Sequence, residues 1–426
     1  MRKLNLLQQA DLRGKIVLVR VDHNVVKKGV IHDPYRIDAT IGTLYYINAK
    51  GGKIILTTHI GRPGNPEKGT IQIGPETSVE PVVEYLKNKL HINIKIPDYS
   101  VADQKGITLV EDSIKSCVNE LKEGVTDAVY LPNTRWFEGE ESKGEKADLF
   151  ARQLAGLADV YVNDAFGSWQ AHVSTVEMAK LLPSYAGFLL QKEMAELDKV
   201  YRPKRPFVSV VAGAKFDTKI DSLRALLNLS DHLVLGGVIY NAYLAAKYGF
   251  LIEGIDDKDI CLAKEFVKHT QKYPGKIIEL PYVVSSKTKE GKKEGAYKTV
   301  DIRKCKAGDN LDFILDVGKA SFDVKEINQV FHKAKTIFVN AVMGFTPYFN
   351  EGTIALDQLI DDNADAVKLY GGGDTMHELK RLLPGIYILA LDNPKYFIFT
   401  GGGAVLKAIQ EGSPLEMPPI KALLKK

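Results

Sequence analysis

Short apolar runs rich in β-formers alternate with amphipathic stretches along nearly the whole chain. The apolar runs are typical of strands buried on both faces, and the stretches 38–50 and 78–90 between them have the apolar spacing of helices. In the first half, strands are predicted at 15–22, 52–59, 126–133 and 158–165. In the second half, they are predicted at 207–213, 231–237, 276–284, 336–342, 365–371 and 396–401.

Strand and helix in alternation predict an α/β fold with parallel sheets and right-handed crossovers. The 426 residues suit two domains of about 200 residues each, so we expect two doubly wound parallel-sheet domains. A helix predicted over 188–200 joins them. The first domain is predicted to hold residues 1–186, completed by 407–426, and the second 187–406. The Lys- and Gly-rich segment 285–300 predicts a solvated hairpin or loop.

Composition narrows the class of protein. Hydrophobic residues make up 45% and charged residues 26%, as in a globular enzyme and unlike a disordered chain. No run of eighteen apolar residues predicts a membrane span, and the N-terminus has no signal-peptide pattern. Cys117, Cys261 and Cys305 are far apart and lack metal-ligand spacing, which favours a reducing cytoplasm. The net charge of +4 suits an anionic small substrate as well as nucleic acid, and no nucleic-acid motif accompanies it.

Two glycine triplets, 371–373 and 401–403, each end a predicted strand and open a predicted helix. Such a turn points backbone N–H groups and a helix dipole at an anion. Thr375 could donate to a phosphate oxygen, and Asp374 could hold Mg²⁺ directly or through water. The alternative is a tight turn that needs glycine for steric reasons, which explains one triplet better than two. Neither a P-loop nor a G-x-G-x-x-G in the first turn is present.

Charged residues follow the ends of other predicted strands. Lys215 and Lys219 are four apart and are predicted to share a helix face around an anion, with two solvated lysines as the alternative. In the first half, cationic and polar groups recur at the carboxyl ends of successive strands, which is how a basic cleft for a small phosphorylated acid is built. These groups are Arg20, Asp22, Asn24, Arg36, His59, Arg62 and Arg135.

The chain resembles the phosphoglycerate kinase family along essentially its whole length. RVDHN at 20–24 is similar to the family's RVDFN, HIGRP at 59–63 to H-[LM]-G-R-P, and NTR at 133–135 to N-[LT]-R. VNDAFG, GFLLQKE, GAKFDTKI, GGGDT and TGGGA follow in family order. The resemblance implies two domains facing a cleft, with a hinge between them. It also implies reversible, Mg²⁺-dependent phosphoryl transfer between ATP and 3-phosphoglycerate in glycolysis.

The resemblance also implies roles for individual residues. The acid substrate would be held by Asp22, His23, Asn24, Arg36, His59, Ile60, Gly61, Arg62 and Arg135. The nucleotide would be held by Gly213, Ala214, Lys215, Lys219, Gly237, Gly318, Asn340, Gly372, Gly373, Asp374 and Thr375, with Asp374 on the metal. Catalysis would fall to Arg36, Lys215, Lys219, Gly373 and Gly402. The partners would be small molecules, ATP/ADP and 3-phosphoglycerate, with no nucleic acid or membrane, and we expect a cytoplasmic monomer.

The sequence departs from the family at two positions of the implied site. The family's arginine that binds the substrate phosphate is missing here, and Gln170 is the residue nearest to it in alignment. Pro347 occupies the position of the family's acidic residue that binds the ribose hydroxyls. Either ribose or adenine recognition differs here, or the nearby Glu351 substitutes. These losses motivate an alternative hypothesis, a binding protein on the same scaffold without efficient catalysis. A nicotinamide-dependent dehydrogenase is a third hypothesis, and the missing dinucleotide fingerprint argues against it.

Overall fold

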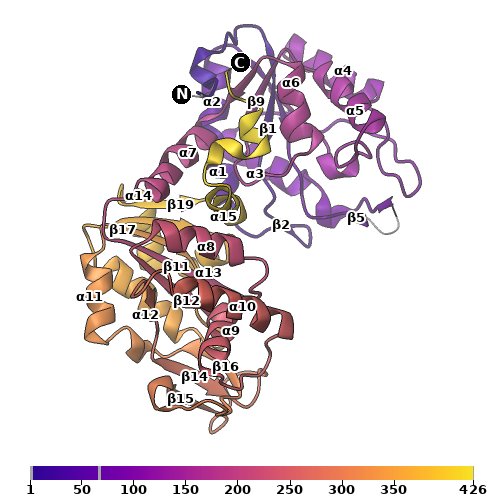
Figure 1. The fold of residues 1–426 in the computed structure, drawn as a ribbon. Helices are drawn as coiled ribbons and strands as arrows, with labels where there is room; N and C mark the ends of the chain where they lie inside the picture. The colour runs from indigo at the N-terminus through magenta and orange to yellow at the C-terminus, as the bar shows by residue number, and fades with distance from the viewer. Residues whose placement is uncertain (1–2, 66–68, 426) are drawn as a thin grey trace. The chain divides into compact units, whose positions relative to one another are not determined.

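The computed structural model describes residues 3–65 and 69–425 (Figure 1). Two compact units emerge: a first unit of Met1–Met194 and Pro414–Lys426, and a second unit of Ala195–Ser413. The first division, after Met194, lies within α7 (Phe188–Tyr201), and the second follows Ser413, whereas the predicted boundaries are 186 and 406. The start of α7 belongs to the first unit because the Phe188 ring packs edge-on against Tyr46 at 4.9 Å and its N–H donates to Thr43 Oγ1.

The first unit contains a six-stranded parallel sheet in the order β10-β9-β1-β4-β8-β7. Its strands are β1 (Ile16–Val21), β4 (Lys53–Thr57), β7 (Ile94–Lys95), β8 (Ala128–Tyr130), β9 (Val160–Asp164) and β10 (Ser184–Ala186). The four strands predicted in this half are confirmed as β1, β4, β8 and β9. Every residue of β1 is buried, which explains why its sequence is apolar except for Arg20. The principal helices are α2 (Ile41–Ala49), α3 (Glu80–Leu90), α4 (Asp112–Glu123) and α5 (Glu145–Ala155).

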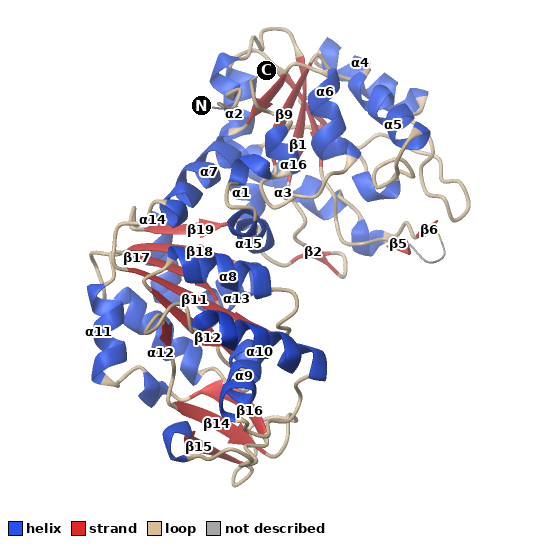
Figure 2. Ribbon diagram, in the orientation of Figure 1, coloured by secondary structure: helices blue, strands red, loops and turns tan. Residues whose placement is uncertain are grey.

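The second unit contains another six-stranded parallel sheet, in the order β13-β12-β11-β17-β18-β19. Its strands are β11 (Phe207–Gly213), β12 (His232–Gly236), β13 (Ile277–Ile278), β17 (Thr336–Asn340), β18 (Val367–Gly371) and β19 (Tyr396–Phe399). Figure 2 shows helices on both faces of this sheet, as in a doubly wound fold. They include α8 (Ile220–Leu229), α9 (Gly237–Tyr248), α10 (Asp257–Thr270), α11 (Lys325–Lys333), α12 (Glu351–Asp361), α13 (Gly373–Leu382), α14 (Pro384–Asp392) and α15 (Gly402–Gln410).

The single strand predicted over 276–284 is wrong. The segment divides into β13 and β14 (Tyr282–Ser286), which belong to different sheets. Pro281 has no N–H for a ladder, and the Tyr240 hydroxyl bonds to both backbone groups of Leu280, at 2.9 and 3.0 Å. The hairpin expected around 285–300 is confirmed, because β14 pairs antiparallel with β15 (Tyr297–Asp301) and with β16 (Phe313–Val317).

The two ends of the chain pair with each other in the first unit. The N–H of Asn5 donates to the carbonyl of Leu423 at 3.1 Å, and that of Lys425 donates to Lys3 at 2.9 Å. The C-terminal segment, with α16 (Pro418–Lys421), therefore completes the first unit, while all of α15 stays in the second. Within 3–65 and 69–425, no helix has the length and apolar character needed to cross a membrane.

Candidate active site

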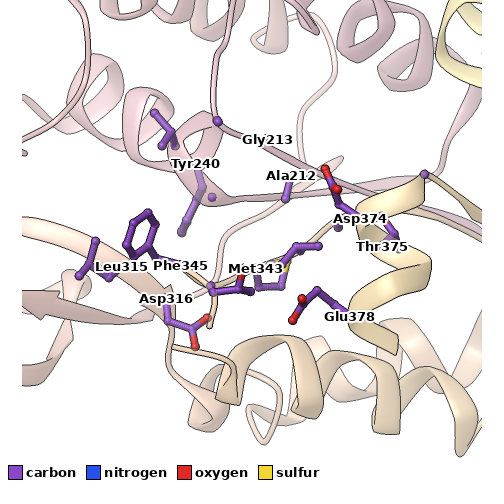
Figure 3. Close-up of a pocket in the computed structure, with 18 of the residues that line it drawn as sticks. Ala212, Gly213, Tyr240, Leu315, Asp316, Met343, Phe345, Asp374, Thr375 and Glu378 are labelled. Carbon is purple, nitrogen blue, oxygen red and sulfur yellow. The ribbon is translucent and has the colours of Figure 1, made fainter. Parts of the chain in front are cut away.

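A cavity of about 830 Å³ opens at the carboxyl ends of the strands of the second unit (Figure 3). Ligands of open parallel sheets bind at this edge. We call it the nucleotide cavity, after the ligand predicted for it. Its lining includes most of the predicted nucleotide residues, namely Gly213, Ala214, Lys219, Gly237, Asn340, Gly372, Gly373, Asp374 and Thr375, together with Gly402. Lys215 and Gly318 are not among the residues that line it.

The two glycine triplets meet back to back at one wall of this cavity. A Cβ on Gly402 would lie 2.3 Å from the Cα of Gly372 and 2.4 Å from its N. Gly372 has φ of +130°, a conformation that other residues avoid, and its missing side chain leaves room for Asn340 and Thr375. Gly373, in contrast, faces open space. The steric explanation therefore holds for Gly372 and Gly402, and Gly373 leaves the start of α13 open to a ligand.

Lys219 is the half-buried cation of this cavity, whose lining also includes the exposed Lys289 and Arg381. Its Nζ donates to the carbonyl of Ala212 at 2.7 Å and to Oδ1 of Asn340, whose amide in turn donates to Gly371. Burial lowers the pKa of Lys219 to about 8, against the opposing charge of Asp374. The ammonium group is thus held by two acceptors at the edge of the cavity, with one N–H left for a ligand.

The prediction that Lys215 and Lys219 share a helix face is wrong, because α8 begins only at Ile220. Residues before it form a turn held by the carboxylate of Asp259, which accepts from the N–H groups of Phe216 and Asp217 at 3.0 and 3.1 Å. The side chain of Lys215 is exposed on this turn. Gly318 lies beyond the end of β16, where its N–H donates to Tyr282 at 2.8 Å.

The first unit carries a charged cluster at the carboxyl edge of its own sheet, made of Arg20, Asp22, Asn24, Arg36, His59 and Arg135. Arg20 on β1 is fully buried and is held by Ser174 Oγ at 2.8 Å and His59 Nδ1 at 3.0 Å. The other nitrogen of His59 lies 3.2 Å from Asn24 Nδ2. Burial, together with the charge of Arg20, lowers the pKa of His59 to about 3, so the imidazole is neutral at pH 7.

Asp22 and Arg36 form the ion pair of this cluster, with 3.3 Å between Oδ2 and Nη1. Burial by itself raises the pKa of Asp22, but the neighbouring positive charges, chiefly Arg36, outweigh it and hold the pKa below its usual value. The ring of His23 lies elsewhere: it is completely buried, between Tyr130 OH at 2.9 Å and Thr40 Oγ1 at 3.0 Å. Burial lowers its pKa to about 3, and its contacts are those of a core residue.

Arg135 contacts one other predicted residue, Gly61, at this edge. Its Nη1 donates to the carbonyl of Gly61 at 2.5 Å, and Gly61 has a φ of +64°. Its Nε lies 3.3 Å from Glu141 but makes no hydrogen bond. Ile60 is buried, and its N–H donates to Asn133 at 3.1 Å. Arg62 is exposed.

A small hollow of about 50 Å³ lies beside this cluster. Arg20, His59 and Arg135 line it from one side, and the segment 167–172, including Gln170 and His172, lines the other. His172 Nε2 lies 3.4 Å from Glu141. Gln170, which stands nearest in alignment to the position of the family's phosphate-binding arginine, therefore borders the same hollow as Arg20 and Arg135.

Three acidic or basic groups were not predicted from the sequence. Glu141 contacts Arg135 and His172 in the first unit, and no spacing pattern indicates it. Glu378 and Arg381 line the nucleotide cavity. The sequence does carry a signal for Glu378. It lies four residues after Asp374 on α13, and therefore on the same helix face.

A protein-built metal cage is absent: the described residues contain no group of three or more His, Cys, Asp or Glu side chains arranged to hold a metal ion. A single carboxylate, Asp374, lines the nucleotide cavity at the start of α13. Mg²⁺ is ordinarily bound by one or two carboxylates together with substrate phosphates, so this donor fits a metal that arrives with the nucleotide.

Comparisons with known proteins identify the family of this chain. The sequence model of the family described as phosphoglycerate kinase matches residues 7–412. The chain is 33% identical to the phosphoglycerate kinase of Pseudothermotoga lettingae, over the whole of both chains. It is 34% identical to that of Dictyoglomus turgidum, over 98% of this chain and 97% of the relative.

Solved structures give the same result. The phosphoglycerate kinase of Coxiella burnetii superimposes with a TM-score of 0.73 at 27% identity, covering 99% of each chain. The enzyme of Pyrococcus horikoshii, at 23% identity and a TM-score of 0.75, shares the fold. With a family match from residue 7 to residue 412 and relatives above 30% identity along their full length, this chain belongs to the phosphoglycerate kinase family.

Proposed function

We propose that this protein is an active phosphoglycerate kinase. In the reaction, a carboxylate oxygen of 3-phosphoglycerate attacks the γ-phosphorus of ATP, the bond from that phosphorus to the β-bridging oxygen breaks, and ADP and 1,3-bisphosphoglycerate form. The observation that carries the proposal is the nucleotide cavity, where a half-buried lysine, Lys219, faces a glycine turn that opens a helix. Backbone N–H groups at such a turn bind phosphate.

The nucleotide binds in the cavity of the second unit. Its phosphates lie at Gly372, Gly373 and Thr375, near Lys219, and its base lies against the apolar wall that includes Leu315 and Phe345. Gly213, Ala214, Gly237, Asn340 and Gly402 complete this site. Lys215 and Gly318 contribute less, since neither lines the cavity. Asp374 would hold Mg²⁺, which would supply compensation of the phosphate charge.

The acid substrate binds to the charged cluster of the first unit. Arg36, Arg62 and Arg135 supply positive charge, and Asn24 and His59 supply hydrogen bonds. Asp22 orients Arg36 through their ion pair. Gly61 contributes backbone, and the buried side chains of His23 and Ile60 support the site from the core.

Catalysis rests on alignment and charge compensation, because phosphoryl transfer requires little covalent chemistry from the protein. Arg36 and Lys219 each offer a positive group to the charge that develops during transfer. The N–H groups at the starts of α13 and α15, beginning at Gly373 and Gly402, offer further donors. We further propose a cytoplasmic monomer, which suits its three free cysteines and a reaction between small molecules.

A coupled turnover assay tests the proposal. Purified protein, MgATP and 3-phosphoglycerate are combined with glyceraldehyde-phosphate dehydrogenase, and NADH oxidation is followed while the acid is raised well above ordinary concentrations. Saturable turnover is expected, with a raised KM for the acid because Gln170 replaces a charged contact. Absence of turnover at saturation, with MgATP still bound in calorimetry, would instead establish a binding protein. That alternative is not favoured, because Lys219 and most of the charged cluster are retained.

A further inference from the structure

The nucleotide cavity contains a carboxylate that no predicted role accounts for. Glu378 on α13 lines the cavity, and its side chain is only 8% exposed. Burial of a carboxylate is costly unless it is paired, and this one is paired with Arg381, whose Nη2 lies 2.5 Å from Oε2. Figure 3 shows Glu378 reaching from α13 into the cavity, between Asp374 on one side and the group of Asp316, Leu315 and Phe345 on the other.

The position of Glu378 along α13 matches the middle of a nucleotide. Asp374 lies in the first turn of the helix, where phosphates bind, and Glu378 follows four residues later. At 1.5 Å per residue this is about 6 Å along the helix, one turn beyond the phosphate end. The apolar wall for the base lies farther across the cavity. The sugar of a bound nucleotide therefore comes to rest near Glu378.

The other acidic residues that line the cavity are committed or badly placed. Asp316 accepts from the N–H groups of Val317 at 2.8 Å and Gly352 at 3.1 Å, so both of its oxygens already serve the backbone. Glu253 is exposed, and Asp374 is at the phosphate end. Glu378 Oε1, at 3.3 Å from Arg381 Nε, keeps lone pairs directed to no other described group.

A chain of hydrogen bonds connects Glu378 to the loop that carries Pro347. Arg381 Nη2 donates to Asn350 Oδ1 at 3.0 Å, and Asn350 Nδ2 donates to the carbonyl of Pro347 at 2.7 Å. This loop offers the cavity a proline and no carboxylate. Glu351, which the sequence suggested as a substitute, is not among the lining residues and pairs with Lys292 instead. The acid available to the sugar thus comes from α13.

We propose that Glu378, oriented by Arg381, accepts hydrogen bonds from the vicinal hydroxyl groups of the nucleotide ribose and makes the protein select ribonucleotides over deoxyribonucleotides. A carboxylate that accepts from ribose hydroxyls is a general solution to this recognition problem. The inference rests on the proposed function for its ligand. It changes the residue that reads the sugar from one on the loop after β17 to one on α13.

Calorimetric titration of the full-length protein with MgADP and with Mg-2′,3′-dideoxy-ADP tests the assignment. Wild-type protein should bind MgADP about ten- to a hundredfold more tightly, the value of a charge-assisted hydrogen bond. Glu378→Gln should lose that factor for MgADP and leave dideoxy-ADP binding unchanged. The matched control, Glu351→Gln on the neighbouring α12, should alter neither affinity. Glu378→Asp, which keeps the charge, should restore part of the discrimination and serves if the glutamine variant does not fold.

Two results would overturn the assignment. One is equal weakening of both nucleotides by Glu378→Gln, which would make Glu378 a structural partner of Arg381. The other is a glutamine variant that still prefers MgADP by the wild-type factor. Failure of the proposed function is read separately, as wild-type protein that binds MgADP but does not turn over 3-phosphoglycerate.

Discussion

The two units each place groups proposed to bind anions at the carboxyl edge of a parallel sheet, but one site is built from backbone and the other from side chains. The nucleotide cavity uses glycine turns, helix starts and one half-buried lysine. The charged cluster uses long side chains that hold one another, as Arg20 holds His59 and Asp22 holds Arg36. A backbone site depends on close packing, so one added methyl group disrupts it. A side-chain site depends on the balance of charges, and one member can change while the others remain in place.

The largest effect should follow from removing Lys219, the half-buried lysine of the nucleotide cavity. Lys219→Ala is expected to lower kcat by about 10²–10³-fold, because a fixed positive group near the transferring phosphoryl is lost. Lys215→Ala, on the exposed turn outside the cavity, should reduce kcat far less. The kcat values of both variants are measured by steady-state kinetics. Equal losses of kcat would contradict the assignment of the larger role to Lys219.

Packing of the backbone site is tested by Gly402→Ala. The new Cβ would lie 2.3 Å from the backbone of Gly372, so one of the two turns must move. We expect the free energy of unfolding to fall by about 1–3 kcal/mol, as in other overpacked interiors. Gly373→Ala meets no atom within 4 Å and is the control for this stability measurement. Denaturant titration that found both variants equally stable would refute the close approach of the triplets.

The pH dependence of the nucleotide site follows from the lowered pKa of Lys219, which is about 8. The charged form is needed for phosphate binding, so kcat/KM should fall above pH 8, approaching tenfold per pH unit. Stability should respond in the opposite sense. Between the folded pKa and the unfolded value the unfolded chain holds more protons, so this lysine makes the protein more stable as pH rises. A flat kcat/KM profile from pH 7 to 9.5 would contradict the assignment.

Restoring the arginine that the charged cluster lacks should strengthen binding of the acid substrate. Gln170→Arg adds a guanidinium to the hollow already bordered by Arg20 and Arg135. The KM for 3-phosphoglycerate should fall about tenfold, with kcat nearly unchanged, because the contact forms with substrate and transition state alike. Substrate titrations of the variant and the wild type measure this. A fall in kcat instead would mean that the added guanidinium disturbs the ion pairs and hydrogen bonds of the charged cluster.

Much of the fold could be predicted because apolar runs and glycine turns are local signals. The run at 207–213 became β11 with the same bounds, and the helix expected from Phe188 became α7. The segment 276–284 could not be divided in advance, since its break depends on the hydroxyl of Tyr240 from a distant helix. The shared helix face of Lys215 and Lys219 failed for the same reason, because Asp259 on α10 holds the turn before α8.

By itself the sequence determined the two parallel sheets, the glycine turns and the family, because these depend on periodicity and on motifs in fixed order. Only the tertiary structure decided which charged residues keep hydrogen-bonding capacity for a ligand. It buried His23 between Tyr130 and Thr40, engaged both oxygens of Asp316, and left Glu378 facing the nucleotide cavity. Burial and pairing depend on contacts between distant segments. A sequence pattern therefore identifies an acidic or basic residue, but it does not show whether that residue is paired within the protein or is available to a ligand.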